Sequence, residues 1–150
     1  VVTPLRKLTG WNYFSHFRRM LGLYAFFYGL LHLTTYLAFD RGFNLLSVAS
    51  DTAKRPFILA GMTALFLMIP LAVTSTNGAI KRMGAARWKR LHSLVYPAAI
   101  AAVLHYYLLV KADVRLPIAF AISLGFLLAY RAVANRLATV RRKPSPVSAP

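Results

Sequence analysis

The chain has 150 residues, of which 58% are hydrophobic, and its 19 Lys and Arg outnumber three acids to give a formal net charge of +16. An average soluble domain has only about 45–50% apolar residues, and disordered chains have fewer still. This composition therefore excludes both classes and indicates a membrane protein with basic edges. The absence of cysteine also excludes disulfides, iron–sulfur clusters and zinc sites with cysteine ligands.

The chain opens with an apolar segment, residues 1–5, which Arg6 and Lys7 follow. A secretory signal peptide has its basic residues before its apolar ones, so this segment has the wrong order for one. We interpret it as the end of an earlier membrane span. The chain is then expected to be the C-terminal part of a longer protein.

Four stretches of the chain contain no Asp, Glu, Lys or Arg: residues 20–39, 56–80, 91–110 and 116–130. A membrane-spanning helix needs about 20 apolar residues, so the first three stretches are long enough to span. The fourth reaches a similar length through residues 132–134 if Arg131 extends its charged end to the membrane surface. Pro70 and Pro97 lie inside spans and are expected to kink them. The sequence thus predicts an all-α, polytopic transmembrane helix bundle with four spans.

The basic residues are unevenly distributed among the segments that connect these spans. Fourteen lie before the first span, between the second and third, or after the fourth, and five lie in the other two loops. Because cytoplasmic loops carry the excess of Lys and Arg, the first and third spans are expected to run outwards from the cytoplasm. The charge also suits contact with anionic membrane lipid. No nucleic-acid partner is expected, because the chain has no folded basic domain.

The end of the chain, residues 141–150, combines Arg and Lys with Pro and Ser. This composition predicts a disordered basic tail. Residues 1–140 are then expected to form one membrane domain.

Histidines are the remaining candidate metal ligands, because three separated acids cannot form a carboxylate-rich metal site. His32 lies in the first span and His105 in the third, each towards the outer side. In the predicted orientation these spans are parallel, so the two imidazoles are expected at similar depth. Two neutral imidazoles on facing helices can hold a haem iron between them. A buried histidine pair that is hydrogen-bonded to Tyr or Thr remains the alternative.

His92 lies 13 residues before His105, at the cytoplasmic start of the third span. This spacing is a rise of about 20 Å along a straight helix, which would suit a second haem, but it separates the two side chains by about 140° of rotation. Pro97 lies between them and could change this relation by a kink. A lone histidine at the membrane interface is the other interpretation of His92. His16 is interpreted as a solvated loop residue.

Several segments together resemble a known family: RRMLGL at 18–23, LHLTTY at 31–36, TST at 74–76, WKRLHSLVY at 88–96 and HY at 105–106. They are similar to the MsrQ (YedZ) family, the haem-binding membrane subunits of the bacterial periplasmic methionine-sulfoxide reductase system. The spacing of His92 and His105 is also that of the fifth helix of the ferric reductase-like transmembrane superfamily. The resemblance covers nearly all the chain up to the basic tail.

The resemblance implies a six-span protein of the bacterial inner membrane with b-type haem and FMN. The present chain would contain the last four spans and the end of the second. Electrons would come from the quinone pool or from a cytosolic flavin reductase. They would pass to a periplasmic, molybdopterin-containing catalytic subunit that repairs oxidised methionine. The chain is then expected to be an electron-transfer subunit and not the catalytic subunit.

The resemblance also assigns roles to residues. His32 and His105 match the pair that holds the outer haem of the superfamily, and His92 matches one ligand of the inner haem. The partner of His92 is expected 14 residues before His32, where this sequence has Arg18. Arginine has no lone pair for iron, but it could bind a haem propionate or a flavin phosphate. His92 would then have another ligand, contact FMN or quinone, or have only a structural role.

A different class of function is also compatible with histidines inside a membrane. In a transporter or proton relay, His32 and His105 would titrate and would not bind iron. Such proteins usually place carboxylates inside their spans as well. Here Asp40, Asp51 and Asp113 all lie outside the four predicted spans. The haem interpretation is therefore favoured.

Overall fold

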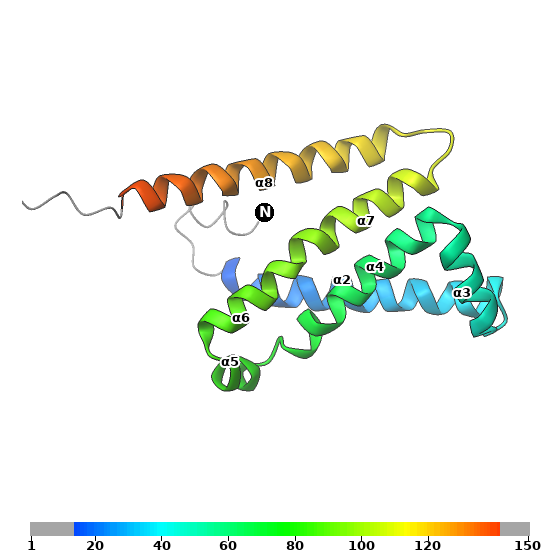
Figure 1. Cartoon of the computed structure of the whole chain (residues 1–150), viewed down its shortest axis with the longest axis horizontal. Helices are drawn as coiled ribbons and strands as arrows, with labels where there is room; N and C mark the ends of the chain where they lie inside the picture. Colours follow the sequence, from blue (N-terminus) through cyan, green and yellow to red (C-terminus); the bar gives the residue numbers. More distant parts are fainter. Residues whose placement is uncertain (1–13, 142–150) are drawn as a thin grey trace, which may run out of the picture.

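The computed structural model describes the backbone of residues 14–141 and the side chains of residues 17–137. Within this part the chain is helical and contains no strand (Figure 1). In chain order the elements are α2 (Phe14–Thr35), the π-helical turn η1 (Tyr36–Asp40), α3 (Leu45–Lys54), α4 (Pro56–Val73), α5 (Asn77–Met83), α6 (Ala85–Leu91), the 3₁₀ turn η2 (His92–Leu94), α7 (Val95–Leu109) and α8 (Arg115–Arg141). The predicted all-α fold is confirmed.

Four segments are long and apolar enough to cross a membrane: Phe17–Asp40, Pro56–Val73, Ala85–Leu109 and Arg115–Leu137. They correspond in order to the four predicted spans, and the chain is a multi-pass membrane protein. Large apolar side chains lie exposed along these helices, as lipid-facing side chains do. The last helix continues to Arg141, the first residue of the predicted tail. The remainder of that tail and the apolar segment at residues 1–5 lie outside the described residues.

The second span is shorter than the predicted 56–80, because α4 ends at Val73. The Thr74 hydroxyl donates to the Pro70 carbonyl at 2.6 Å, and the Ser75 hydroxyl donates to the Leu71 carbonyl at 2.6 Å. Such bonds compete with the backbone for the last carbonyls of a helix. The Thr76 hydroxyl then accepts from the backbone amide of Ala79 and caps α5. Hydroxyl groups therefore end the span early and start a separate short helix.

The third span is longer than the predicted 91–110, because α6, η2 and α7 follow one another from Ala85 to Leu109. The 3₁₀ turn His92–Leu94 interrupts the α-helical geometry just before Pro97. Proline has no backbone N–H to bond the carbonyl four residues earlier, which here belongs to Ser93. The expected disturbance near Pro97 is thus present as a change of helix type.

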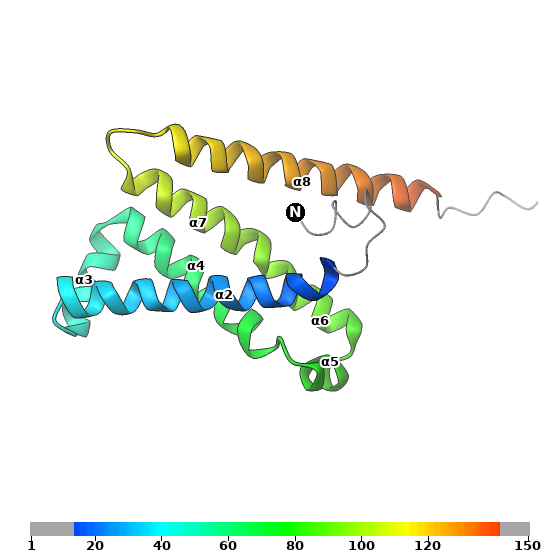
Figure 2. The ribbon, with the colours of Figure 1, turned by 180° about the vertical axis from the view of Figure 1, so that it is seen from behind.

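The helix α4 lies between α2 and α7 in the packing order, and α8 packs on α7 (Figures 1 and 2). Contact between α4 and α7 is the most extensive in the bundle. Ala60 and Ala64 on α4 and Ala98 on α7 are buried, and small residues of this kind let membrane helices approach closely. The side chain of Leu65 similarly lies 3.3 Å from where a Cβ on Gly29 of α2 would be.

The connection from α2 to α4 was expected to be a loop but contains η1 and the helix α3. We call this the α3 end of the bundle, and the opposite end, near α5, the α5 end (Figure 1). Gly42 and Phe43 both adopt positive φ angles and turn the chain between η1 and α3. The side chain of Asn44 then accepts from the backbone amide of Ser47 and caps α3.

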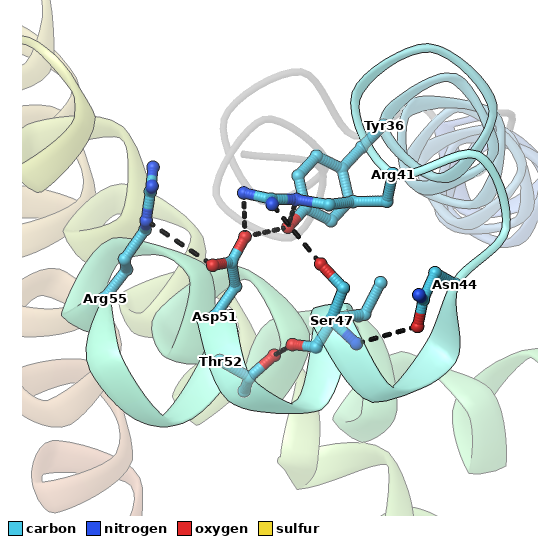
Figure 3. A network of polar contacts seen from close by, with 8 residues as sticks. Tyr36, Arg41, Asn44, Ser47, Asp51, Thr52 and Arg55 are labelled. Atoms are coloured by element: carbon cyan, nitrogen blue, oxygen red, sulfur yellow. Dashed lines mark hydrogen bonds and ion pairs between the residues drawn. The ribbon is translucent and has the colours of Figure 1, made fainter.

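A polar network at the α3 end joins η1 to α3 (Figure 3). The carboxylate of Asp51, which is only 9% exposed, accepts a 2.8 Å hydrogen bond from the Tyr36 hydroxyl and pairs with Arg41 and Arg55. Arg41 also donates to the Tyr36 hydroxyl and to Ser47. Its bond to Tyr36 raises the pKa of Arg41 above the ordinary value, so the guanidinium stays charged beside the carboxylate. The network fixes the chain one turn beyond His32.

Candidate functional site

His32 and His105 come together at the α3 end, although 73 positions separate them in the sequence. His32 lies in the last turn of α2, and His105 lies in the second half of α7. Their ring centroids are 6.2 Å apart, with an angle of 67° between the ring planes. The structure therefore places side by side the two histidines that were expected at similar depth.

A backbone carbonyl on α4 holds the ring of His105. The Nδ1 atom of His105 lies 2.6 Å from the carbonyl oxygen of Phe57, in the first turn of α4. Because a carbonyl oxygen only accepts, Nδ1 carries the proton and donates it. In the neutral imidazole this leaves the lone pair on Nε2. His105 is thus in the tautomer that can bind a metal through Nε2.

The separation of the two rings matches that of two imidazoles that bind one metal ion. Two ring nitrogens that each lie about 2 Å from one metal ion place their ring centroids roughly 6 Å apart, and the observed separation is 6.2 Å. A metal-binding histidine usually donates its other ring N–H to a carbonyl or carboxylate, as His105 does to Phe57. That partner is neither Tyr nor Thr, which the alternative interpretation of the pair expected. Within residues 17–137 no group of three or more His, Cys, Asp or Glu could hold a metal ion.

His92 lies at the α5 end of the bundle, in a different environment. Its ring stacks on Trp88, with centroids 3.9 Å apart, and its Nε2 atom lies 3.1 Å from the Thr74 hydroxyl. The indole of Trp88 donates to the Thr74 carbonyl at 3.0 Å. The hydroxyl hydrogen of Thr74 is already donated to Pro70, so Nε2 of His92 must be the donor to Thr74. In this arrangement Nε2 of His92 has no lone pair for iron.

Arg18 lies in the first turns of α2 and is exposed. It is close enough to His92 for a Coulombic interaction between the two side chains. The next residue, Arg19, instead donates a 2.9 Å hydrogen bond to Asn77 of α5. The structure therefore brings Arg18 and His92 to the same end of the bundle, as the resemblance implied. The backbone of His16 lies in the first turn of α2 and not in the predicted loop, and its side chain lies outside the described residues.

Sequence reasoning missed two features of this arrangement, the Phe57 carbonyl and Gly61. A backbone carbonyl leaves no signal in the sequence. The signal of Gly61 was present but weak, since a glycine inside an apolar helix often marks a close approach of a neighbour. Trp88 and Thr74 belong to the segments that carried the resemblance. Trp88 lies four residues before His92, a spacing that places the two side chains on one helix face, whereas the contact of Thr74 with His92 depends on the folded chain.

Comparison with known proteins identifies the family. Residues 1–103 match the family described as ferric reductase like transmembrane component. The chain is 51% identical over 143 residues to "Protein-methionine-sulfoxide reductase heme-binding subunit MsrQ" of Rhodospirillum rubrum, an alignment that covers 95% of the chain and 67% of the relative. The chain belongs to the MsrQ family of ferric reductase-like transmembrane proteins.

Other MsrQ relatives extend this result. The protein of the same name from Herminiimonas arsenicoxydans is 49% identical, over 87% of the chain and 61% of the relative. That from Xanthomonas campestris pv. campestris is 46% identical, over 99% of the chain and 69% of the relative. The chain thus spans about two thirds of the length of these MsrQ proteins. No solved structure matches it significantly.

Proposed function

We propose that this chain is the haem-binding part of a membrane electron-transfer subunit that serves a methionine-sulfoxide reductase. The observation that carries the proposal is the 6.2 Å approach of the His32 and His105 rings, with the Phe57 carbonyl fixing the tautomer of His105. Its relatives are named as heme-binding subunits of that reductase. The resemblance to the family implies that this haem would be of b type.

The protein itself has a defined part in this function. A bound haem would supply one-electron chemistry through its iron. His32 and His105 would hold it, one from each of two helices. The Phe57 carbonyl keeps the proton of His105 on Nδ1, which orients the ring and increases its basicity as a ligand. Within the described residues His105 is half-buried and His32 is exposed.

The wider assignment rests on the family. We infer that residues 1–140 form the haem-binding membrane domain in the bacterial inner membrane, and residues 141–150 a basic tail. The electron donor would be quinone or a cytosolic flavin reductase, and the acceptor a periplasmic catalytic subunit that contains molybdopterin. FMN would be a second cofactor. Arg18 and His92, which lie together at the α5 end, are the candidate residues for an anionic cofactor group there.

An optical spectrum of the detergent-purified protein tests the proposal. Haem held by two histidines gives a Soret band that shifts when dithionite reduces the iron, and the expected reduced-minus-oxidised spectrum is that of low-spin b-type haem. A transporter or proton relay that uses the same histidines gives no such band. Protein that contains no haem after expression with sufficient haem supply would contradict the proposal.

The orientation in the membrane gives a separate prediction. The excess of Lys and Arg predicts that the α4–α7 connection and the C-terminus lie in the cytoplasm. A reporter fused after Val140 should therefore be active only if it works in the cytoplasm. A fusion after Asp113, in the connection between α7 and α8, should show the opposite behaviour. Strong periplasmic activity of the first fusion would reverse the side assigned to the haem.

The role of Arg18 gives another prediction. If its guanidinium binds a propionate or phosphate, Arg18→Ala should lower the haem or flavin content, and Arg18→Lys should restore it only in part, because lysine cannot form the two-pronged contact. Arg19→Ala is the matched control, since it removes the same charge from the adjacent position and only breaks the bond to Asn77. Cofactor content per protein is measured in each variant. Unchanged content in both Arg18 variants would leave Arg18 with a role in topology alone.

A further inference from the structure

The ring of His105 lies unusually close to the backbone of α4 at Gly61. A Cβ atom built on Gly61 would lie 2.7 Å from Nδ1 of His105, 3.0 Å from Cε1 and 3.2 Å from Cγ. Side-chain carbons do not approach other heavy atoms as closely as the first of these distances. Any residue other than glycine at this position would therefore displace the imidazole.

The same closeness creates the hydrogen bond of His105. Gly61 is four residues after Phe57 in α4, so the carbonyl of Phe57 points along the helix towards Gly61. A side chain on Gly61 would stand beside this carbonyl, on the side from which the imidazole approaches. Nδ1 of His105 reaches the carbonyl at 2.6 Å, because the ring occupies the space that a side chain on residue 61 would fill.

We propose that Gly61 is a positioning residue for the histidine pair. Because Gly61 has no side chain, the His105 ring can approach the backbone of α4 and donate a hydrogen bond to the Phe57 carbonyl. The proton is then on Nδ1, and the lone pair of Nε2 is available beside His32. This proposal rests on the proposed function for its consequence, the binding of haem, but not for the position and tautomer of the ring. The helix α4 thus contributes to the site without supplying a ligand to iron.

Gly61→Ala is the variant that tests this proposal, and Gly125→Ala is its matched control. Gly125 lies inside α8, and a Cβ atom built there meets nothing within 4 Å. Both variants make the same chemical change within a helix. Only the first places a methyl group against a histidine ring.

The first measurement uses the haem-free protein with nitrogen-15 in its histidines. NMR of the wild type is expected to show His105 protonated on Nδ1 and unprotonated on Nε2. In Gly61→Ala the His105 signals should shift towards a mixture of tautomers, while those of His92 stay unchanged. Gly125→Ala should match the wild type throughout. A wild type in which Nδ1 of His105 is unprotonated, or a Gly61→Ala variant with unchanged His105 signals, would overturn the proposal.

The second measurement is haem affinity, for which loss of a supporting contact to a ligand costs about 10-fold or more. Gly61→Ala should bind haem at least about 10-fold more weakly than Gly125→Ala, and the haem that it retains should have a higher midpoint potential because the ligand is less basic. Added imidazole should restore the low-spin spectrum by replacing the displaced ring. Wild-type affinity and potential in Gly61→Ala would count against the proposal. A wild type without haem, but with the expected NMR result, would contradict only the proposed function.

A thermal comparison keeps the test decisive if Gly61→Ala is unstable. The substitution should lower the melting temperature Tm of the haem-free wild type, because the new methyl group clashes with the imidazole. In a His105→Ala background the clash is absent, and the same substitution should leave Tm unchanged or raise it, since alanine is the better helix former. An equal loss of Tm in both backgrounds would show that the glycine is needed for a reason other than His105.

Discussion

Replacing His32 or His105 with alanine is expected to remove most of the low-spin haem signal and most electron delivery to the reductase. Each ring comes from a different helix, and the two lie 6.2 Å apart, so neither can take the place of the other in holding a haem. Each variant would lose one of the two imidazoles that hold it, which would leave the haem weakly bound. The measurement is haem content and the reduced-minus-oxidised spectrum, at matched expression.

The other two histidines are the controls for this experiment. His92→Ala should have a smaller or separable effect, because its Nε2 donates to Thr74 and its ring stacks on Trp88. His16→Ala should have almost none. Full low-spin haem in either His32→Ala or His105→Ala would refute the ligand assignment, whatever the family comparison suggests.

Asp51→Asn is expected to destabilise the α3 end of the bundle. The carboxylate of Asp51 joins Tyr36 and Arg41 to α3, and hydrogen bonds to charged groups contribute more than neutral ones. The amide has no charge to pair with the two arginines, so Tm of the purified protein should fall by roughly 5 °C or more. Because the network begins one turn after His32, haem should also dissociate faster from this variant.

Asp113→Asn is the matched control for the loss of a carboxylate. Asp113 is exposed, and its contact with the Arg115 side chain is 4.0 Å long. Asparagine can still accept from the backbone amide of Arg115, as Asp113 does at 3.0 Å. Tm of this variant should therefore stay close to that of the wild type. Equal losses for the two variants would show that the network at Asp51 contributes nothing beyond an ordinary surface charge.

The four spans could be predicted because the absence of charge over about 20 residues is a strong signal for a membrane helix. The short helices could not be predicted in this way. The helix α3 follows a turn in which Phe43 adopts a positive φ angle, a conformation that its residue type does not suggest. The end of α4 at Val73 depends on the hydroxyls of Thr74 and Ser75, which lie in an uncharged stretch and so looked like part of the span.

The two candidate ligands of the site could be predicted from the sequence, but the groups that position them could not. Counting residues along two parallel helices places His32 and His105 at one depth, and the structure brings them together. The position of Gly61 against His105 follows instead from how closely α4 and α7 pack. The stacking of His92 on Trp88 is a local contact between residues four apart on one helical stretch, whereas its contact with Thr74 arises from a chain reversal through α5 and α6. Pairings of this kind are set by tertiary packing, which a linear pattern does not contain.

The π-helical turn Tyr36–Asp40 restricts how many residues the chain can have between α2 and α3. The close approach of Leu65 to Gly29 constrains α2 before this turn, and the ion pair of Arg41 with Asp51 holds the chain after it. Each α-helical residue adds about 100° of rotation, so a regular α-helix would not bring both Gly29 and Arg41 to the faces where they make these contacts. The π-helical turn, which has more residues per turn, corrects the difference in rotation. A homologue that lost one residue here could keep the orientation of its α2 histidine or its arginine–aspartate pair, but not both.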